Sequence, residues 1–196
     1  MNNYIKNIVE AFDFNGIINN GDKNKAIVSN VKEFSIKKMF EDIKNGIRPN
    51  EYVWEVYKDT PIYKVQSKEE LRLLIENTLK LFGRDCLLNW IDTSNITDMS
   101  ALFKDLNPHN IKISKCNVSN VTSMLNMFYK CENFNSDLSK WDVSNVYDTR
   151  GMFYECKNFN SDLSKWDVSN VKDMKSMFYY CKKFNSDLSK WNVSNV

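Results

Sequence analysis

Residues 141–165 read WDVSNVYDTRGMFYECKNFNSDLSK, and residues 166–190 read WDVSNVKDMKSMFYYCKKFNSDLSK. These two stretches are identical at 19 of 25 positions. Toward the N-terminus, residues 116–140 match residues 141–165 at 16 positions, and residues 91–115 match residues 116–140 at 8. The start of a fifth copy runs from Trp191 to Val196. A fixed period of roughly 20 to 50 residues is typical of stacked-repeat proteins, so this repeat decides the predicted fold.

The apolar residues of one unit fall at about every third position, which suits neither a β-strand nor a sustained helix. A unit of this length cannot bury these side chains alone, but stacking on a neighbour at about 4.8 Å sets each one against its own copy. The spacing therefore predicts an α+β repeat solenoid, a right-handed coil of short strands, tight turns and single helical turns.

Three segments of the unit carry local signals. Met174 to Cys181 has apolar spacings of 3, 1 and 3, which favour a helical turn. We expect one strand at Leu188–Trp191 and a second short strand after a turn at Val168–Val171. The segment Asn185–Asp187 is predicted to be the turn that closes each coil.

Stacking also predicts four rows of identical side chains in the core. These structural rows are Trp141, Trp166 and Trp191; Phe128, Phe153 and Phe178; Phe134, Phe159 and Phe184; and Cys131, Cys156 and Cys181. The cysteines lie in the apolar phase of the repeat, so a structural role is favoured over a metal or redox site. The five cysteines include no CxxC pair, and neither a disulfide framework, a metal nor a cofactor is expected.

The repeat has a recognisable consensus. The string Trp-Asp-Val-Ser-Asn-Val-x-x-Met-x-x-Met-Phe-x-x-Cys-x-x-Phe-Asn-x-Asp-Leu-Ser-Lys resembles the repeat of BspA-like leucine-rich-repeat surface proteins, over residues 91–196. The resemblance implies a leucine-rich-repeat-like solenoid that binds proteins or mediates adhesion at a bacterial cell surface.

Two outward-facing rows form the candidate binding face. Tyr129, Tyr154 and Tyr179 each follow a buried phenylalanine, and neighbours on a helical turn diverge by about 100°, so the tyrosines face partly outward. Such a row is a platform for a protein or a glycan; the alternative is that the rings only stack and shield the coil edge. The second row is Lys140, Lys165 and Lys190. It runs beside stacked aspartates at positions 137, 162 and 187, for which solvated turns are favoured over a calcium site.

Composition and motifs argue against an enzyme. His109 is the single histidine, the net charge is +2, and no phosphate loop, G-x-S-x-G or H-E-x-x-H pattern occurs. We expect a non-enzymatic protein–protein interaction or adhesion module whose partner is an unidentified protein or glycan, host-derived if the producer lives on a host, and not a nucleic acid. The alternatives are an intracellular scaffold and a truncated repeat array with little independent function.

Location is left open by the sequence. No apolar run approaches the ~18 residues of a membrane helix, and the first residues do not resemble a signal peptide, so a surface location rests on the family resemblance. The fifth copy stops without a polar capping repeat, and we expect self-association through this uncapped C-terminal end.

The chain divides into three predicted regions. Residues 1–66 form a helical or mixed region of unknown role, with a helical stripe over 36–47 and strands within 52–65. Residues 67–90 hold a capping helix and lead-in, because Ser67 to Glu70 is a capping box and Gly83 ends the apolar stripe. Residues 91–196 hold four 25-residue repeats and the start of a fifth.

Overall fold

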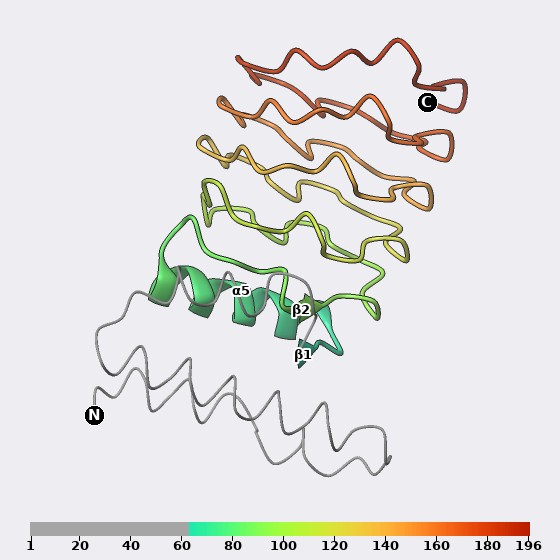
Figure 1. The fold of residues 1–196 in the computed structure, drawn as a ribbon. Coiled ribbons are helices and arrows are strands. Elements are labelled where there is room, and N and C mark those ends of the chain that lie inside the picture. Colours follow the sequence, from blue (N-terminus) through green and yellow to red (C-terminus); the bar gives the residue numbers. More distant parts are fainter. Residues whose placement is uncertain (1–62) are drawn as a thin grey trace, which may run out of the picture. The chain divides into compact units, whose positions relative to one another are not determined.

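The computed structural model describes residues 63–196, which wind into a stack of coils (Figure 1). Its regular elements are strand β1 (Tyr63–Lys64), helix α5 (Lys68–Phe82) and strand β2 (Ile91–Asp92). β1 and β2 are parallel, with Tyr63 opposite Ile91. Residues 63 and 64 therefore belong to the stack, although we predicted the N-terminal region to extend to residue 66. The helical stripe predicted over 36–47 and most of the strand segment predicted within 52–65 lie outside the described residues.

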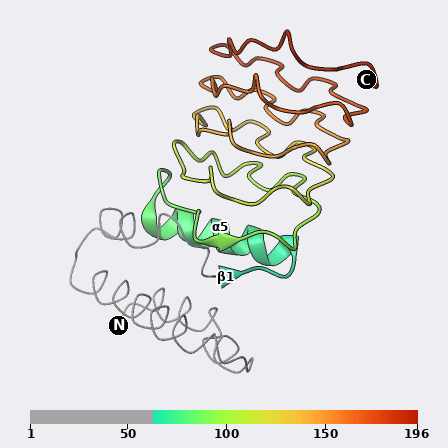
Figure 2. The same cartoon turned by 45° about the vertical axis from the view of Figure 1, so that its right-hand side comes forward.

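Helix α5 lies at one end of the stack in both views (Figures 1 and 2). The Ser67 side chain accepts a hydrogen bond from the Glu70 N–H at 3.1 Å, and the Glu70 carboxylate accepts from the Gln66 N–H at 2.7 Å. This reciprocal capping starts the helix where the sequence predicted it, and Gly83, with φ of 81°, ends it. The buried face of α5 includes Leu71, Leu74, Ile75 and Thr78.

The apolar face of α5 covers the core of the first coil. A small apolar cavity between them is lined by Leu71 and Ile75 of the helix and by Leu88, Met99 and Phe103 of the coil. All five side chains are at least nine-tenths buried. The helix thus shields apolar side chains at this end of the stack, as a terminal cap does in stacked-repeat proteins.

Successive coils are joined by one backbone bridge in each unit and by further hydrogen bonds. Isolated parallel bridges join Asp98 to Ser123, Ser123 to Asp148, and Asp148 to Asp173, so residues 25 apart are neighbours. The short strand predicted after Val168–Val171 is thus a single bridge, at Asp173. The coils are also joined by N–H groups that cross between them, such as the Phe128 N–H to the Met152 carbonyl at 2.9 Å.

The segment predicted as a helical turn has a different backbone. In the second unit, the Tyr129 N–H bonds to the Asn126 carbonyl at 3.1 Å, while the neighbouring Phe128 and Lys130 N–H groups bond to the next coil. Asn126 and Lys130 have φ values of 54° and 59°, and a left-handed residue interrupts a right-handed helix. The segment is a chain of tight turns, and the prediction of a helical turn was wrong.

The predicted strand at Leu188–Trp191 was also wrong. The Trp191 N–H bonds to the Leu188 carbonyl at 3.0 Å, which closes a turn there. The carboxylate of Asp187 accepts the Ser189 N–H at 2.9 Å and fixes the chain in this turn. The predicted turn at Asn185–Asp187 lies between this turn and an earlier one, which the Phe184 N–H closes on the Cys181 carbonyl at 3.2 Å.

Aromatic columns fill the core. The rings of Phe103, Phe128, Phe153 and Phe178 stack with centroids 4.9, 5.7 and 5.6 Å apart. A second column of Phe134, Phe159 and Phe184 has spacings of 5.7 Å. Within a coil the two columns meet, since the Phe128 and Phe134 centroids are 3.9 Å apart. The predicted phenylalanine rows thus form continuous columns through the stack.

Candidate functional site

Tyr129, Tyr154 and Tyr179 form one column on the outside of the stack, which we call the tyrosine column. The ring centroids are 4.7 Å apart at both steps, with interplanar angles of 14° and 19°. Tyr129 and Tyr154 are half-buried, whereas Tyr179 is 49% exposed. The repeat puts the rings in register, because each tyrosine follows a core phenylalanine at the same position of its coil.

Lysines flank the tyrosine column. The Lys104 and Lys130 ammonium nitrogens both lie 5.5 Å from the ring centroid of Tyr129. At the other end, Tyr180 packs on Tyr179 at 5.1 Å and carries the Lys182 ammonium 5.8 Å from its own centroid. These are cation–π distances, so the column is an aromatic row with cationic ends.

The position of Tyr154 in the middle of the column changes the pKa of its hydroxyl. Desolvation, together with the charges that Tyr129 and Tyr179 would carry, raises the pKa of Tyr154 above its ordinary value. At neutral pH the Tyr154 hydroxyl is protonated, as a phenol ordinarily is, and can donate a hydrogen bond.

The second predicted row, Lys140, Lys165 and Lys190, is exposed. Within residues 63–196, no hydrogen bond, ion pair or ring contact joins it to the tyrosine column. Its charge acts instead on the neighbouring aspartates: hydrogen bonds from the serine two residues on, and secondarily the lysine charge, lower the pKa of Asp137 and Asp187. The structure therefore does not bring the two predicted rows together into one site.

The cysteine row is part of the core. The Cys131 Sγ lies 3.1 Å from the Phe103 carbonyl, and the Cys156 Sγ lies 3.0 Å from the Phe128 carbonyl. Burial raises the pKa of Cys131 to about 12 and that of Cys181 to about 11. Thiols with such pKa values are poor nucleophiles and poor metal ligands at neutral pH. In residues 63–196, no group of three or more His, Cys, Asp or Glu side chains is arranged to hold a metal ion.

The tryptophan row is tied to the coil before it. The indole N–H groups of Trp141, Trp166 and Trp191 each donate at 3.0 Å to a carbonyl 28 residues earlier. In the same direction, the side-chain amide of Asn170 donates to the Ser144 carbonyl at 2.7 Å. The rings of Trp166 and Trp191 are stacked with centroids 6.5 Å apart.

A comparison with known protein families shows which family the chain belongs to. The family model described as "Mycoplasma protein of unknown function, DUF285" matches residues 75–191, more than half of the chain. The chain belongs to the DUF285 family. No curated protein and no solved structure matches it. Among the residues that the structure describes, no helix of this DUF285 protein is long and apolar enough to cross a membrane.

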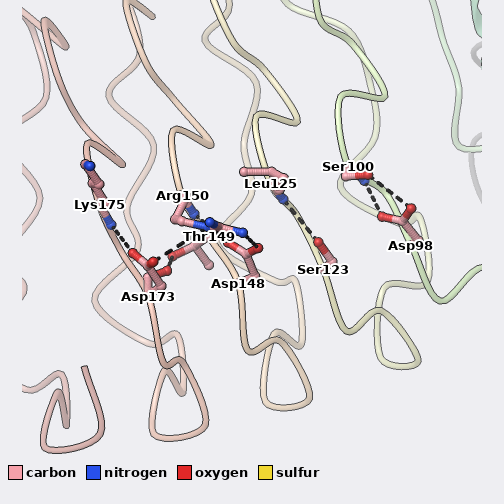
Figure 3. A network of polar contacts seen from close by, with 9 residues as sticks. All are labelled: Asp98, Ser100, Ser123, Leu125, Asp148, Thr149, Arg150, Asp173 and Lys175. Carbon is pink, nitrogen blue, oxygen red and sulfur yellow. Dashed lines mark hydrogen bonds and ion pairs between the residues drawn. The ribbon is translucent and has the colours of Figure 1, made fainter.

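The DUF285 chain also has a polar row that the sequence analysis missed (Figure 3). The row contains the bridge positions Asp98, Ser123, Asp148 and Asp173. Arg150 makes two bonds to Asp148, at 3.0 and 2.7 Å, and lies 3.7 Å from Asp173. The Arg150 hydrogen bond lowers the pKa of the mostly buried Asp148 carboxylate, so a single arginine compensates two stacked acids.

Two further arginines attach the cap to the first coil. The Arg72 Nη1 of α5 donates to the carbonyls of Ala101, Leu102 and Lys104 at 3.1, 2.8 and 3.0 Å. Arg84 likewise donates to the Leu106 and Asn107 carbonyls. The chain has four arginines against 23 lysines, and this scarcity was the one signal that could have singled these residues out.

Proposed function

We propose that this DUF285 protein is a non-enzymatic module for protein–protein interaction or adhesion, and that the tyrosine column is its binding face. We further propose that its coils form a leucine-rich-repeat-like solenoid of the BspA-like surface type. The observation that carries the binding proposal is the continuous column of stacked, partly exposed tyrosines outside a core that already has its own phenylalanine columns.

The column is suited to binding because its rings are already ordered. Binding normally costs about 0.5–1.5 kcal/mol for each mobile side chain that is fixed at an interface. Tyr154 is held between two rings at 4.7 Å, so little of this cost remains when a partner covers it. Tyrosine is also among the residues that contribute most to binding at protein interfaces.

The test measures which cell-surface proteins are retained by each of three immobilised full-length chains. The first is the natural chain, the second carries Tyr129→Ser, Tyr154→Ser and Tyr179→Ser, and the third carries Lys140→Ser, Lys165→Ser and Lys190→Ser. We expect a partner retained by the first and third chains and lost from the second, with circular dichroism showing that all three are folded. Equal retention by the first and second chains would refute the tyrosine column as the binding face.

The surface location is tested separately by protease treatment of intact producer cells, with an antibody to residues 1–60 as the readout. Loss of the antibody signal from intact cells supports an adhesin. Protection until lysis refutes a surface role and directs the search to intracellular partners.

A further inference from the structure

The tyrosine column does not offer ring faces to a ligand. Tyr154 is covered on both sides, by Tyr129 and Tyr179, each with its centroid at 4.7 Å. Beyond Tyr129 lie the ammonium groups of Lys104 and Lys130, and Tyr180 packs against Tyr179. Sugars bind aromatic side chains mainly by stacking C–H groups on a ring face, so this column is poorly suited to a neutral glycan.

The column presents ring edges and phenol hydroxyls instead. The edge of an aromatic ring carries partial positive charge, and a protonated phenol is a hydrogen-bond donor. The rings repeat these groups along the column with centroids 4.7 Å apart, one ring from each coil. Such a row is complementary to acceptor groups, and best to charged ones such as carboxylates.

Cations outnumber acids around the column. Lys104, Lys130 and Lys182 lie beside its rings. Two acids lie nearby: Glu132 is already bonded to Lys157 at 2.7 Å, and Glu155 follows Tyr154 directly and acts on its hydroxyl. The fourth unit adds Lys183 next to Lys182, with no acidic residue between Lys175 and Asn185.

From these observations we infer that the tyrosine column takes an acidic, extended segment of a protein partner, with carboxylates against the ring edges, hydroxyls and flanking ammonium groups. This inference rests on the proposed function and names the chemistry of its partner. A partner of this kind is bound edge-on, so the phenol oxygens and the lysines both contribute, whereas a stacked sugar would need neither.

The test measures fluorescence anisotropy of a fluorescein-labelled oligoglutamate peptide with the full chain, at roughly 50 and 150 mM salt. We expect saturable binding that weakens with salt. Lys104→Gln with Lys130→Gln and Lys182→Gln should weaken it by about tenfold, since charge-assisted bonds are lost. Tyr129→Phe with Tyr154→Phe and Tyr179→Phe keeps the stacked rings and should weaken it by about threefold through loss of the hydroxyls.

The matched control removes three charges elsewhere, by Lys140→Gln, Lys165→Gln and Lys190→Gln. It should change the affinity by less than about twofold, because screened charges away from the site contribute little. An equal loss in the control would overturn the inference, because the attraction would then be non-specific. Unchanged thermal midpoints and circular dichroism spectra establish that all variants are folded.

Two glycan probes decide between classes of partner. Column-dependent binding of chitohexaose or of a heparin oligosaccharide, without binding of oligoglutamate, would overturn the inference in favour of a glycan. If oligoglutamate fails but a partner protein is still lost with the tyrosine-to-serine changes, only the acidic chemistry is refuted. If the tyrosine-to-serine changes reduce the retention of no partner protein, the proposed function itself is refuted.

Discussion

Gly151→Ala should destabilise the stack because two independent costs coincide at this position. The residue has a φ of 58°, a left-handed conformation that costs a residue with a side chain about 1 kcal/mol. A Cβ at this position would lie 2.3 Å from the Asn126 Oδ1 of the coil before it. Moving the Asn126 side chain out of its rotamer costs about another 1 kcal/mol. We therefore expect a loss of about 2 kcal/mol in the free energy of unfolding.

The assay is urea denaturation of the full chain, followed by tryptophan fluorescence and circular dichroism. Ser176→Ala is the matched control, because Ser176 has a φ of 57° and already carries a Cβ at the equivalent position of the next coil. This control should change stability by less than about 0.5 kcal/mol.

A double mutant separates the two costs. Asn126→Gly removes the clashing side chain at a φ of 54°, which glycine accepts readily. Gly151→Ala in the Asn126→Gly background should cost only the backbone term, about 1 kcal/mol, which gives a coupling of about 1 kcal/mol. The reasoning is refuted if Gly151→Ala costs no more than Ser176→Ala, or if the double mutant shows no coupling.

Three further predictions concern the cap, the cysteines and pH. Arg72→Lys should lower the free energy of unfolding by about 1–3 kcal/mol, because an ammonium group cannot reproduce the guanidinium's bonds to three carbonyls, and an unchanged urea midpoint would contradict this. Cys131 and Cys156 should react with a thiol reagent at pH 8 only as fast as the chain unfolds, since burial raises the pKa of both; mass spectrometry of the native protein showing rapid labelling of either would contradict this. Asp148→Asn should destabilise the protein at pH 7 and less so in acid: the Arg150 bond lowers the pKa of Asp148, so its contribution is present above about pH 4 and is lost as the pH falls through the lowered pKa. Equal destabilisation at pH 7 and in acid would show that the lost interaction is not the ion pair.

The 25-residue period and the capping box carried most of the correct structural predictions. A fixed period places equal positions of successive units together, so the contact between Tyr129 and Tyr154 follows from counting residues. The helix over residues 68–82 followed from Ser67 and Glu70, because capping is a local interaction within a few residues.

The turn structure was missed for a physical reason. An apolar residue at about every third position suits a helical turn and equally a chain of tight turns. Backbone φ distinguishes them, but the left-handed positions carry Lys130, Glu155 and Tyr180 as well as Asn126 and Gly151, so the residue type does not mark them consistently.

The polar contacts of the candidate site were the least predictable part. The row from Asp98 to Asp173 has Ser123 in the second unit, so the sequence does not show an aspartate repeated at this position in every unit. The lysines beside the tyrosine column, Lys104 and Lys130, occupy two different positions of the repeat. Lys104 lies 25 residues before Tyr129 and Lys130 follows Tyr129 directly, so counting residues places both near this ring, but it does not show that their ammonium groups lie over the ring.

The indole and thiol groups of each coil donate to backbone carbonyls of the coil before it, and every amino acid has a backbone carbonyl. The first unit shares only 8 of 25 residues with the second, yet its Ile113 and Phe103 carbonyls accept from Trp141 and Cys131 as the later units do. These hydrogen bonds between units are therefore indifferent to the residue types on their accepting side. In-frame duplication or deletion of one unit would therefore preserve these backbone-directed bonds, whichever unit then comes before the donor.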